Sequence, residues 1–204
     1  MAIRQHVGDL PNLENYTREV AIDTETMGLQ TKRDRLCVVQ LSPGDGSADV
    51  VQIPADLNDA PNLKKLLCDP EVTKIFHYAR FDMAALKHRF SVDVGPVYCT
   101  KIASKLVRTY TDRHGLKDLT RDLLGIDISK QQQSSDWGSA SLSRAQMDYA
   151  ASDVLHLHDL KRHLDLMLER EGRRELARSC FEFLPTRVAL DLAGWPDTDI
   201  FAHS

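Results

Sequence analysis

Ala21-Ile22-Asp23-Thr24-Glu25-Thr26 has the pattern of a buried strand that carries two carboxylates two residues apart. Because side chains on a strand alternate between its two faces, Asp23 and Glu25 point the same way. Two like charges side by side at the end of a sheet repel each other and are costly to desolvate. Two interpretations follow. Either a divalent cation lies between the carboxylates, or they are ordinary acids on a solvated edge strand.

The length and composition of the chain indicate one α/β domain. Its 204 residues are enough for one sizeable domain, or at most one and a half, and its hydrophobic (42%) and charged (27%) contents are ordinary for a globular protein. The four cysteines are widely spaced and form no Cys-x-x-Cys pair. This spacing predicts reduced, mostly buried thiols and no structural zinc.

The charge and hydropathy patterns limit the location and partners of the chain. Residues 1–10 contain charges and no apolar core, and no apolar run approaches the roughly 20 residues that span a bilayer, so we expect a cytoplasmic protein without membrane contact. The formal net charge of −4 argues against a broad basic surface for long nucleic acid. Residues 80–122 nevertheless carry nine Lys or Arg against five Asp or Glu. This segment is either a phosphate-facing patch or the solvated faces of amphipathic helices.

Apolar periodicity and turn signals divide the chain into strands and helices. Strands are predicted at 20–26, 35–42, 49–53, 73–76 and 97–98. Helices are predicted at 62–67, 80–89, 100–109, 116–124, 144–170 and 174–189, while residues 1–18 have mixed character. Short turns, including Pro43-Gly44-Asp45-Gly46, join the first three strands into an antiparallel meander, and helices then alternate with strands. We therefore predict an α/β fold with a mixed central sheet of about five strands flanked by helices.

Residues 129–141 form a polar run with three consecutive glutamines. We expect a loop there and not a linker between domains, because its single large apolar side chain, Trp137, would be wasted in a disordered tether. Ser143 follows as a helix cap, and the apolar residues of the helix 144–170 recur at three- and four-residue steps.

Two further acids could complete a metal site with the first pair. Asp82 lies at the entry of the helix that follows the fourth strand, although an acid there is also favoured by the helix macrodipole. Asp153 lies on a largely apolar stretch of the helix 144–170, with Tyr149 one turn before it on the same face. The alternative for Asp153 is an ordinary acid in a surface salt bridge. Mg²⁺ and Mn²⁺ prefer hard oxygen ligands, so a set of carboxylates would suit either ion.

In their order along the chain, these acidic motifs resemble those of the DEDD 3′→5′ exonucleases. Asp-x-Glu stands on the first strand, Phe81-Asp82 follows a later parallel strand, and Tyr149-x-x-x-Asp153 lies on a C-terminal helix. The tyrosine marks the DEDDy branch of that family. The resemblance covers roughly residues 20–164 and implies a ribonuclease H-like fold with 3′→5′ exonuclease activity.

The C-terminal motif is also similar to the ribonuclease D pattern, through Trp137, Arg144, Gln146 and Tyr149-Ala150-x-x-Asp153-Val154. One position departs from that pattern. Many relatives carry Asn where this chain has Tyr78. The departure leaves the expected metal ligand four residues later intact, but it puts any substrate contact of the missing Asn in question.

The resemblance implies hydrolysis of phosphodiester bonds with two divalent cations per site, Mg²⁺ or Mn²⁺, about 4 Å apart. Asp23, Glu25 and Asp153 would hold the cation that activates water. Asp23 and Asp82 would hold the cation that stabilises the leaving oxygen. Tyr149 would complete the catalytic set by orienting the attacking water or helping to deprotonate it. Since a phenol has an ordinary pKa of about 10, orientation is the expected role.

The resemblance also implies a set of substrate contacts close to these motifs. The expected residues are Thr24, Met27, Gly28, Leu29, His77, Tyr78, Phe81 and Trp137. Leu29, just past the first motif, would insert between bases as a wedge, as apolar residues at this position do in short-oligonucleotide exonucleases. The alternative is a buried loop leucine.

The size and motif set are most similar to the nanoRNase C group of ribonuclease D-like enzymes, which cut dinucleotides at the end of RNA degradation. Only 34 residues follow Arg170, too few for the accessory HRDC-type domains of full-length ribonuclease D. We therefore expect a single exonuclease domain over residues 1–204, with a short helical extension at about 173–204. The resemblance implies a homo-oligomer, which is an octamer in that group. Large apolar residues of the extension either support self-association or cap the domain's own core: Phe181, Phe183, Leu184, Trp195, Ile200 and Phe201.

The expected function is that of a metal-dependent 3′→5′ exoribonuclease that releases 5′-mononucleotides, mainly from very short RNA. One alternative is ribonuclease D-like trimming of the 3′ ends of tRNA or structured RNA, or DNA exonuclease activity. Another, from a different class, is a catalytically silent RNA-binding module on the same fold. The intact carboxylates and Tyr149 speak against this module, because binding alone does not require four converging acids.

Overall fold

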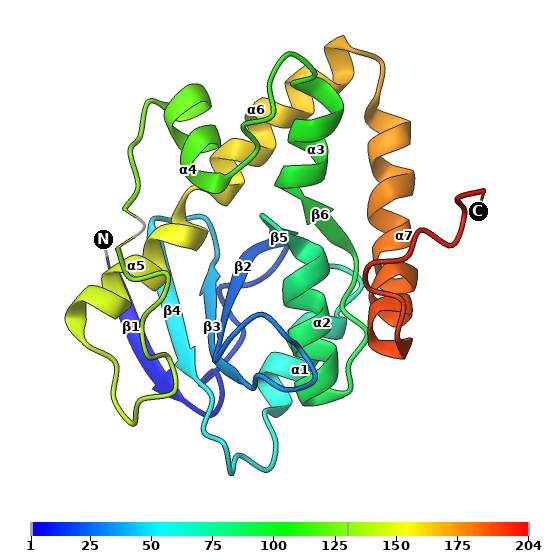
Figure 1. The fold of residues 1–204 in the computed structure, drawn as a ribbon. Helices are drawn as coiled ribbons and strands as arrows, with labels where there is room; N and C mark the ends of the chain where they lie inside the picture. The colour runs from blue at the N-terminus through cyan, green and yellow to red at the C-terminus, as the bar shows by residue number, and fades with distance from the viewer. Residues whose placement is uncertain (1, 130, 204) are drawn as a thin grey trace.

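A computed structural model describes residues 2–129 and 131–203 of the chain. Met1, Ser204 and Lys130, which falls in the loop predicted at 129–141, lie outside the described residues. The centre is a six-stranded sheet in the order β1-β4-β3-β2-β5-β6 (Figure 1). Its strands are β1 (Ala2–Val7), β2 (Glu19–Thr26), β3 (Leu36–Ser42), β4 (Ser47–Gln52), β5 (Thr73–Phe76) and β6 (Val97–Cys99). The strand with the two carboxylates, β2, lies inside this sheet, so the interpretation as an edge strand is wrong.

Strand β2 pairs with an antiparallel neighbour on one side and a parallel neighbour on the other. The β2–β3 and β3–β4 pairs are antiparallel, as the predicted meander requires. The β2–β5, β5–β6 and β1–β4 pairs are parallel. The predicted mixed sheet is therefore confirmed, with six strands instead of about five. The register pairs Asp23 with Gln40 and then becomes irregular between Glu25 and Thr26, so the regular ladder ends at the carboxylates.

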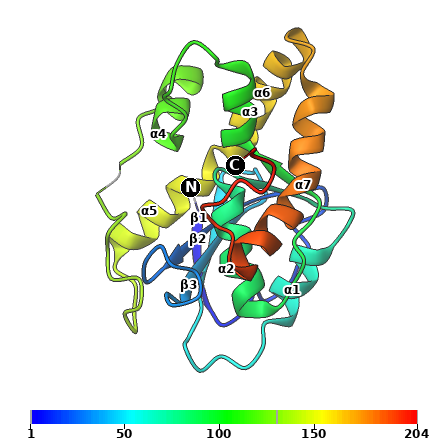
Figure 2. The same cartoon turned by 45° about the vertical axis from the view of Figure 1, so that its right-hand side comes forward.

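Helices cover both faces of the sheet (Figures 1 and 2). They are α1 (Pro61–Cys68), α2 (Ala79–Phe90), α3 (Thr100–Val107), α4 (Leu116–Leu119), the π-helical turn η1 (Thr120–Leu124), α5 (Arg144–Leu155), α6 (Leu157–Arg170) and α7 (Arg174–Ala193). Val20 and Ile22 of β2 pack in one apolar cluster with α1 and α2. Ala21 packs in a second cluster with α3 and α6 on the opposite face. Successive residues of β2 therefore reach two different helical layers.

Three predicted helices differ from the observed ones by a break or by more than two residues. The predicted helix 116–124 is α-helical only over Leu116–Leu119 and continues as the π-helical turn η1. The predicted helix 144–170 is broken at His156, which ends α5 and begins α6, because the two halves pack on different partners: α5 on β3 and β4, and α6 on α3. A one-residue change of direction leaves the three- and four-residue apolar spacing nearly intact, so periodicity does not reveal it. The last helix continues to Ala193, where Gly194 at φ 118° ends it in the left-handed conformation that glycine favours.

Among the described residues, no helix is long and apolar enough to cross a membrane. The four cysteines are free thiols, as predicted. Cys37 and Cys99 are buried, Cys180 is half-buried and Cys68 is exposed.

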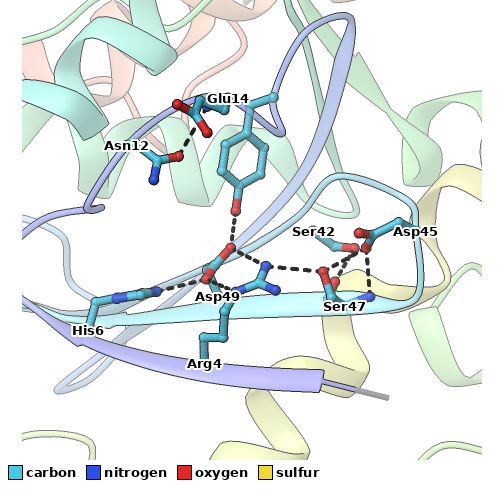
Figure 3. Close-up of polar contacts among 9 residues, drawn as sticks. Arg4, His6, Asn12, Glu14, Ser42, Asp45, Ser47 and Asp49 are labelled. Carbon is cyan, nitrogen blue, oxygen red and sulfur yellow. Dashed lines mark hydrogen bonds and ion pairs between the residues drawn. The ribbon is translucent and has the colours of Figure 1, made fainter.

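The N-terminal strand β1 is an edge strand that sequence patterning does not reveal, because its contacts are polar and distant in the chain. It is held to β4 through the buried carboxylate of Asp49 (Figure 3). Arg4 donates from Nε and Nη2 to the two Asp49 oxygens at 2.7 and 2.8 Å, and His6 Nε2 lies 2.7 Å from Oδ1. The Tyr16 hydroxyl donates to Oδ2 at 2.5 Å. The side chains that contact Asp49 lie 33 to 45 residues away from it in the chain, so no local pattern reveals the cluster.

The attachment of β1 depends on the ionised form of Asp49. Burial alone would raise the pKa of this carboxyl, but hydrogen bonds from Arg4, Tyr16 and His6 outweigh it and hold the pKa at about 2. Because this folded value lies below the unfolded one, the ionised group stabilises the fold above about pH 4, and the contribution is lost as pH falls towards 2. We expect Asp49→Asn to cost about 2–4 kcal/mol of stability at pH 7 and about half as much at pH 3, measured by thermal unfolding.

Asp59→Asn is the matched control for this comparison. Asp59 pairs with Lys64 at 3.0 Å on the surface, where ion pairs contribute little. The control should leave the melting temperature nearly unchanged. An equal loss of stability in Asp49→Asn at pH 7 and pH 3 would contradict the assignment to the ionised carboxylate.

Candidate active site

Asp23 and Glu25 lie on the face of β2 that is covered by α5. This helix begins at Ser143, whose hydroxyl accepts a hydrogen bond from the Gln146 backbone N–H in a capping box, and it carries Asp153 towards β2. One carboxylate oxygen from each of Asp23, Glu25 and Asp153 lies within 4.8 Å of the other two. Three of the predicted metal ligands therefore converge on one point.

Asp82 reaches the same region from the other helical layer. It lies in the first turn of α2 and is 3% exposed, and Thr24 Oγ1 donates a hydrogen bond to its Oδ1 at 2.7 Å. Burial, and next the charge of the neighbouring Asp23, raise the pKa of Asp82 well above its ordinary value. On the other side, Gln40 Nε2 donates to Asp23 Oδ2 at 3.2 Å. Neutral side chains thus hold both carboxylates in place.

The carboxylates disfavour one another's ionised forms. Burial at the base of the site raises the pKa of Asp23, although the backbone N–H of Thr24 works in the opposite direction. Burial and then the charges of Asp23, Asp153 and Asp82 raise the pKa of Glu25 far above its ordinary range. The metal-free cluster therefore retains protons near neutral pH, and a divalent cation that displaced them would relieve the repulsion.

Tyr149 lies half-buried beside this cluster, one turn before Asp153 on α5. Burial raises the pKa of its hydroxyl, and the charges of Asp153, Glu25 and Asp23 raise it further. The phenol is therefore protonated at neutral pH. In the metal-free site, a protonated phenol can orient a water molecule through a hydrogen bond, which is the role expected from the sequence.

A cleft of about 670 Å³ opens over the carboxylates, and every predicted catalytic or substrate-contacting residue lines it. Its walls also contain residues that sequence reasoning did not assign to the site: Thr26, Lys101, Gly115, Leu116, Lys117, Ile128, Ser129, Gln133, Ser134 and Ser135. Lys101 follows β6 almost directly, and this position is the signal that places it at the same end of the sheet. The wall residues that follow Lys101 in the chain are brought to the cleft by loops, and no local sequence pattern predicts the paths of these loops.

The rim of the cleft is apolar in one part and cationic in another. Leu29 and Met27 are 85% and 60% exposed, so the interpretation of Leu29 as a buried loop leucine is wrong. Tyr78 is exposed, and the Lys101 Nζ lies 4.4 Å from the centroid of its ring. His77 is buried, with Nδ1 2.9 Å from the hydroxyl of Thr100.

Three of the expected substrate contacts have structural roles of their own. Thr24 supports Asp82, as described above. At Gly28 a Cβ atom would lie 2.3 Å from the Asp34 Oδ2, so a side chain there would require the Asp34 carboxylate to move. Trp137 is only 3% exposed and packs with residues of the sheet and α5. All three also border the cleft, and their role in substrate binding stays a prediction.

The donor set fits Mg²⁺. The group formed by Asp23, Glu25 and Asp153 offers only hard carboxylate oxygens, the ligands that Mg²⁺ and Mn²⁺ prefer. Asp82, close enough to Asp23 to be affected by its charge, would provide for a second ion. The pKa values of Asp23 and Glu25 are raised because their ionised forms are disfavoured in the metal-free site. A bound cation would stabilise these ionised forms.

Comparison with known proteins is consistent with this geometry. Residues 9–169 match the model of a family described as 3′-5′ exonuclease, and the chain therefore belongs to this family. Ribonuclease D from Granulibacter bethesdensis is 40% identical over 154 residues, which are 76% of this chain and 38% of the relative. The chain thus spans well under half the length of the ribonuclease D proteins that it matches.

The solved structures of NrnC from Brucella melitensis are more similar. One, with bound Mg²⁺, is 62% identical and superposes with a TM-score of 0.96. Another, bound to pGG, is 63% identical with a TM-score of 0.97, and both comparisons cover all of both chains. The predicted family, a ribonuclease D-like 3′-5′ exonuclease, and its ribonuclease H-like fold are confirmed.

The raised pKa of Asp23 gives a test of the carboxylate cluster. Because the folded value lies above the unfolded one, the metal-free folded state binds more protons, and its stability falls as pH rises from about 4 towards the folded pKa. We expect Asp23→Asn to raise the melting temperature of the metal-free protein at pH 8 and to change it much less at pH 4. Mg²⁺ should raise the melting temperature of the parent but not of the variant.

Thermal unfolding in a chelator and in excess Mg²⁺ measures both effects. Asp159→Asn is the control, because Asp159 is a surface acid of α6 that pairs with Arg162 outside the cleft. This control should keep the full response to Mg²⁺. An equal Mg²⁺ response in Asp23→Asn and the parent would show that Asp23 is not a ligand.

Proposed function

We propose that this chain is a metal-dependent 3′→5′ exoribonuclease that releases 5′-mononucleotides, with very short RNA as its main substrate. The observation that supports it most strongly is the convergence of Asp23, Glu25, Asp82 and Asp153, from three separate elements, at one cleft beside Tyr149. Phosphodiester hydrolysis acts on a group that is already anionic, so it needs bound positive charge. A silent binding module would have no use for four mutually repelling acids.

In this proposal two divalent cations, Mg²⁺ or Mn²⁺, supply neutralisation of the phosphate charge and an activated water when bound. Asp23, Glu25 and Asp153 would hold one, and Asp23 and Asp82 the other. Asp23 is thus the ligand that both cations share. Tyr149, whose hydroxyl is protonated in the metal-free site, would orient the attacking water by donating a hydrogen bond.

The dimensions of the cleft support a short substrate. A volume of about 670 Å³ falls within the range of roughly 300–1,000 Å³ typical of sites that enclose small molecules. Brucella melitensis NrnC, at 63% identity, has been solved bound to pGG. Lys101 and Lys117 place two cationic side chains on the cleft wall, where substrate phosphates would lie, and Leu29 at the rim would contact a base.

Purified protein with Mg²⁺ should convert a 5′-labelled RNA dinucleotide to mononucleotides. Asp23→Ala should abolish this conversion, because it removes the ligand that both cations share, whereas Asp159→Asn should retain it. Product analysis across a ladder of RNA and DNA lengths, from two nucleotides upward, measures the preference. Loss of activity in Asp159→Asn as well would mean that the effect of Asp23→Ala is not specific to the site.

Other outcomes of the same experiment would replace the proposal. Trimming of tRNA precursors with an uncleaved dinucleotide would indicate a ribonuclease D-like role. Cleavage of DNA in preference to RNA would favour a DNA exonuclease, a possibility kept open because a DNA polymerase I from Aquifex aeolicus is 34% identical over 169 residues. RNA binding without metal-dependent turnover would indicate a silent binding module.

We also propose that the chain assembles as a homo-oligomer, with an octamer as the expected form. The apolar residues of its C-terminal part fall into two sets. Leu184 and Phe181 pack against the protein's own core, which is the alternative stated above. Phe183, Trp195, Ile200 and Phe201 are instead at least 39% exposed, which supports self-association. The mass in solution, measured by size-exclusion chromatography with light scattering on the sample used for the ladder, tests this assembly.

Leu29 gives a test of substrate contact at the rim. If its side chain packs against a base, Leu29→Ala should raise the KM for the dinucleotide by roughly tenfold, which corresponds to the loss of about 1.5 kcal/mol of apolar contact. The melting temperature should not change, because the side chain is 85% exposed. Leu166→Ala, at a 73% exposed leucine of α6, is the matched control. An unchanged KM in Leu29→Ala would remove Leu29 from the substrate site.

A further inference from the structure

Trp137 is the buried residue of the loop that borders the cleft, and it packs against Tyr149. It is 3% exposed, its ring centroid lies 5.9 Å from that of Tyr149, and the two ring planes are inclined by 39°. Val38 and Val50, from β3 and β4, belong to the same apolar cluster. The indole therefore fills the space between the sheet and the helix that carries Tyr149.

Gln146 ties the loop next to Trp137 to the first turn of α5. Its side chain is buried, and Nε2 donates a hydrogen bond to the backbone carbonyl of Asp136 at 3.1 Å. Its Oε1 accepts from the backbone N–H of Ser143 at 2.9 Å. One side chain thus caps the helix that carries Tyr149 and also holds the peptide that precedes Trp137.

Two further hydrogen bonds tie the other side of the loop to the sheet. Arg35 Nη2 donates to the carbonyl of Gly138 at 3.3 Å, and Gln52 Nε2 donates to the carbonyl of Ser139 at 2.7 Å. The backbone on both sides of Trp137 is therefore attached to regular structure. An aromatic side chain held in this way is a fixed surface for its neighbour.

We infer that Trp137, held by Gln146, is a positioning residue that sets the ring of Tyr149 so that its hydroxyl faces the carboxylate cluster. This inference rests on the proposed function. A tyrosine on a helix can turn about two side-chain bonds, and contact with a fixed indole removes much of that freedom. Trp137 then acts on the reaction through Tyr149 and not by contact with substrate, which differs from the role expected from the sequence.

Two variants weaken the support of Tyr149 in different ways. The indole N–H of Trp137 has no hydrogen-bond partner in the part of the chain that the structure describes, so Trp137→Phe removes volume without breaking a hydrogen bond. Gln146→Glu keeps an acceptor for the Ser143 N–H but loses the donor to Asp136, and glutamate is also favoured at this position of a capping box. The helix cap should therefore survive while the tie to the loop is lost.

We expect Trp137→Phe to lower kcat on the dinucleotide by roughly 10- to 100-fold with little change in KM, because small displacements of a reacting group are costly. Gln146→Glu should lower kcat in the same direction by a smaller factor. The decisive measurement repeats both changes in a Tyr149→Phe background. If Trp137 and Gln146 act only through the Tyr149 hydroxyl, each should then change the residual rate by no more than about twofold.

A spectroscopic measurement tests the contact without using activity. The chain contains two tryptophans, so a Trp195→Phe parent, changed in the C-terminal tail, leaves Trp137 as the only one. Its emission should lie at the short wavelength of a buried indole. Gln146→Glu should shift that emission to longer wavelength without a large fall in melting temperature, because the tie to the loop is lost and the helix cap is kept.

Three kinetic results would overturn the inference. Trp137→Phe could raise KM while kcat is unchanged, which would make Trp137 a direct substrate contact. It could lower the residual rate of Tyr149→Phe by as large a factor as it lowers the parent rate, which would place its effect elsewhere in the site. Both variants could leave kcat unchanged. All rates are compared on whichever RNA or DNA the parent cleaves, and if it cleaves none, the proposed function fails. Independently of activity, an emission unchanged by Gln146→Glu would overturn the inference that Gln146 holds Trp137.

Discussion

Repulsion among four carboxylates at the end of β2 is the constraint on which the rest of the site depends. Burial raises the pKa of Asp23, Glu25 and Asp82, and the charge of Asp23 raises the pKa of Glu25 and of Asp82 further. Acids on one flexible segment would separate into water. Here they are attached to three rigid elements, β2, α2 and α5, whose relative positions are fixed by the apolar clusters on both faces of the sheet.

The alternation of side chains along β2 lets one strand meet both helical layers. Asp23 and Glu25 face α5 and so meet Asp153, whereas Thr24, between them, faces α2 and donates to Asp82. A neutral hydroxyl is suited to this place, because it stabilises a carboxylate without adding to the negative charge. The inner position of β2 matters equally. An edge strand would have a neighbouring strand, with the helices packed on it, on one side only. The polar network around the acids is therefore a consequence of sheet topology.

Much of this arrangement is predictable from local sequence, and the missing parts share one cause. Asp23 and Glu25 are revealed by strand alternation, Asp82 by its place after a strand, and Asp153 by its acidic character on an apolar helix stretch. Strand β1 is missed because Asp49, which holds it, lies more than 40 residues away in the chain. The break at His156 and the wall formed by 115–117 depend in the same way on packing between distant segments. Local periodicity carries no information about such contacts.

The charge of the cluster also links the binding of cations to the binding of nucleic acid. An anionic substrate that approached uncompensated carboxylates would be repelled, and bound cations reverse that interaction. By linkage, the phosphate group must then strengthen cation binding by the same factor. In the proposed function, Lys101 and Lys117 on the cleft wall would attract phosphates whether or not cations are bound. The proposed function therefore divides substrate attraction between two groups: the carboxylates contribute only when cations are bound, and the lysines contribute with or without them.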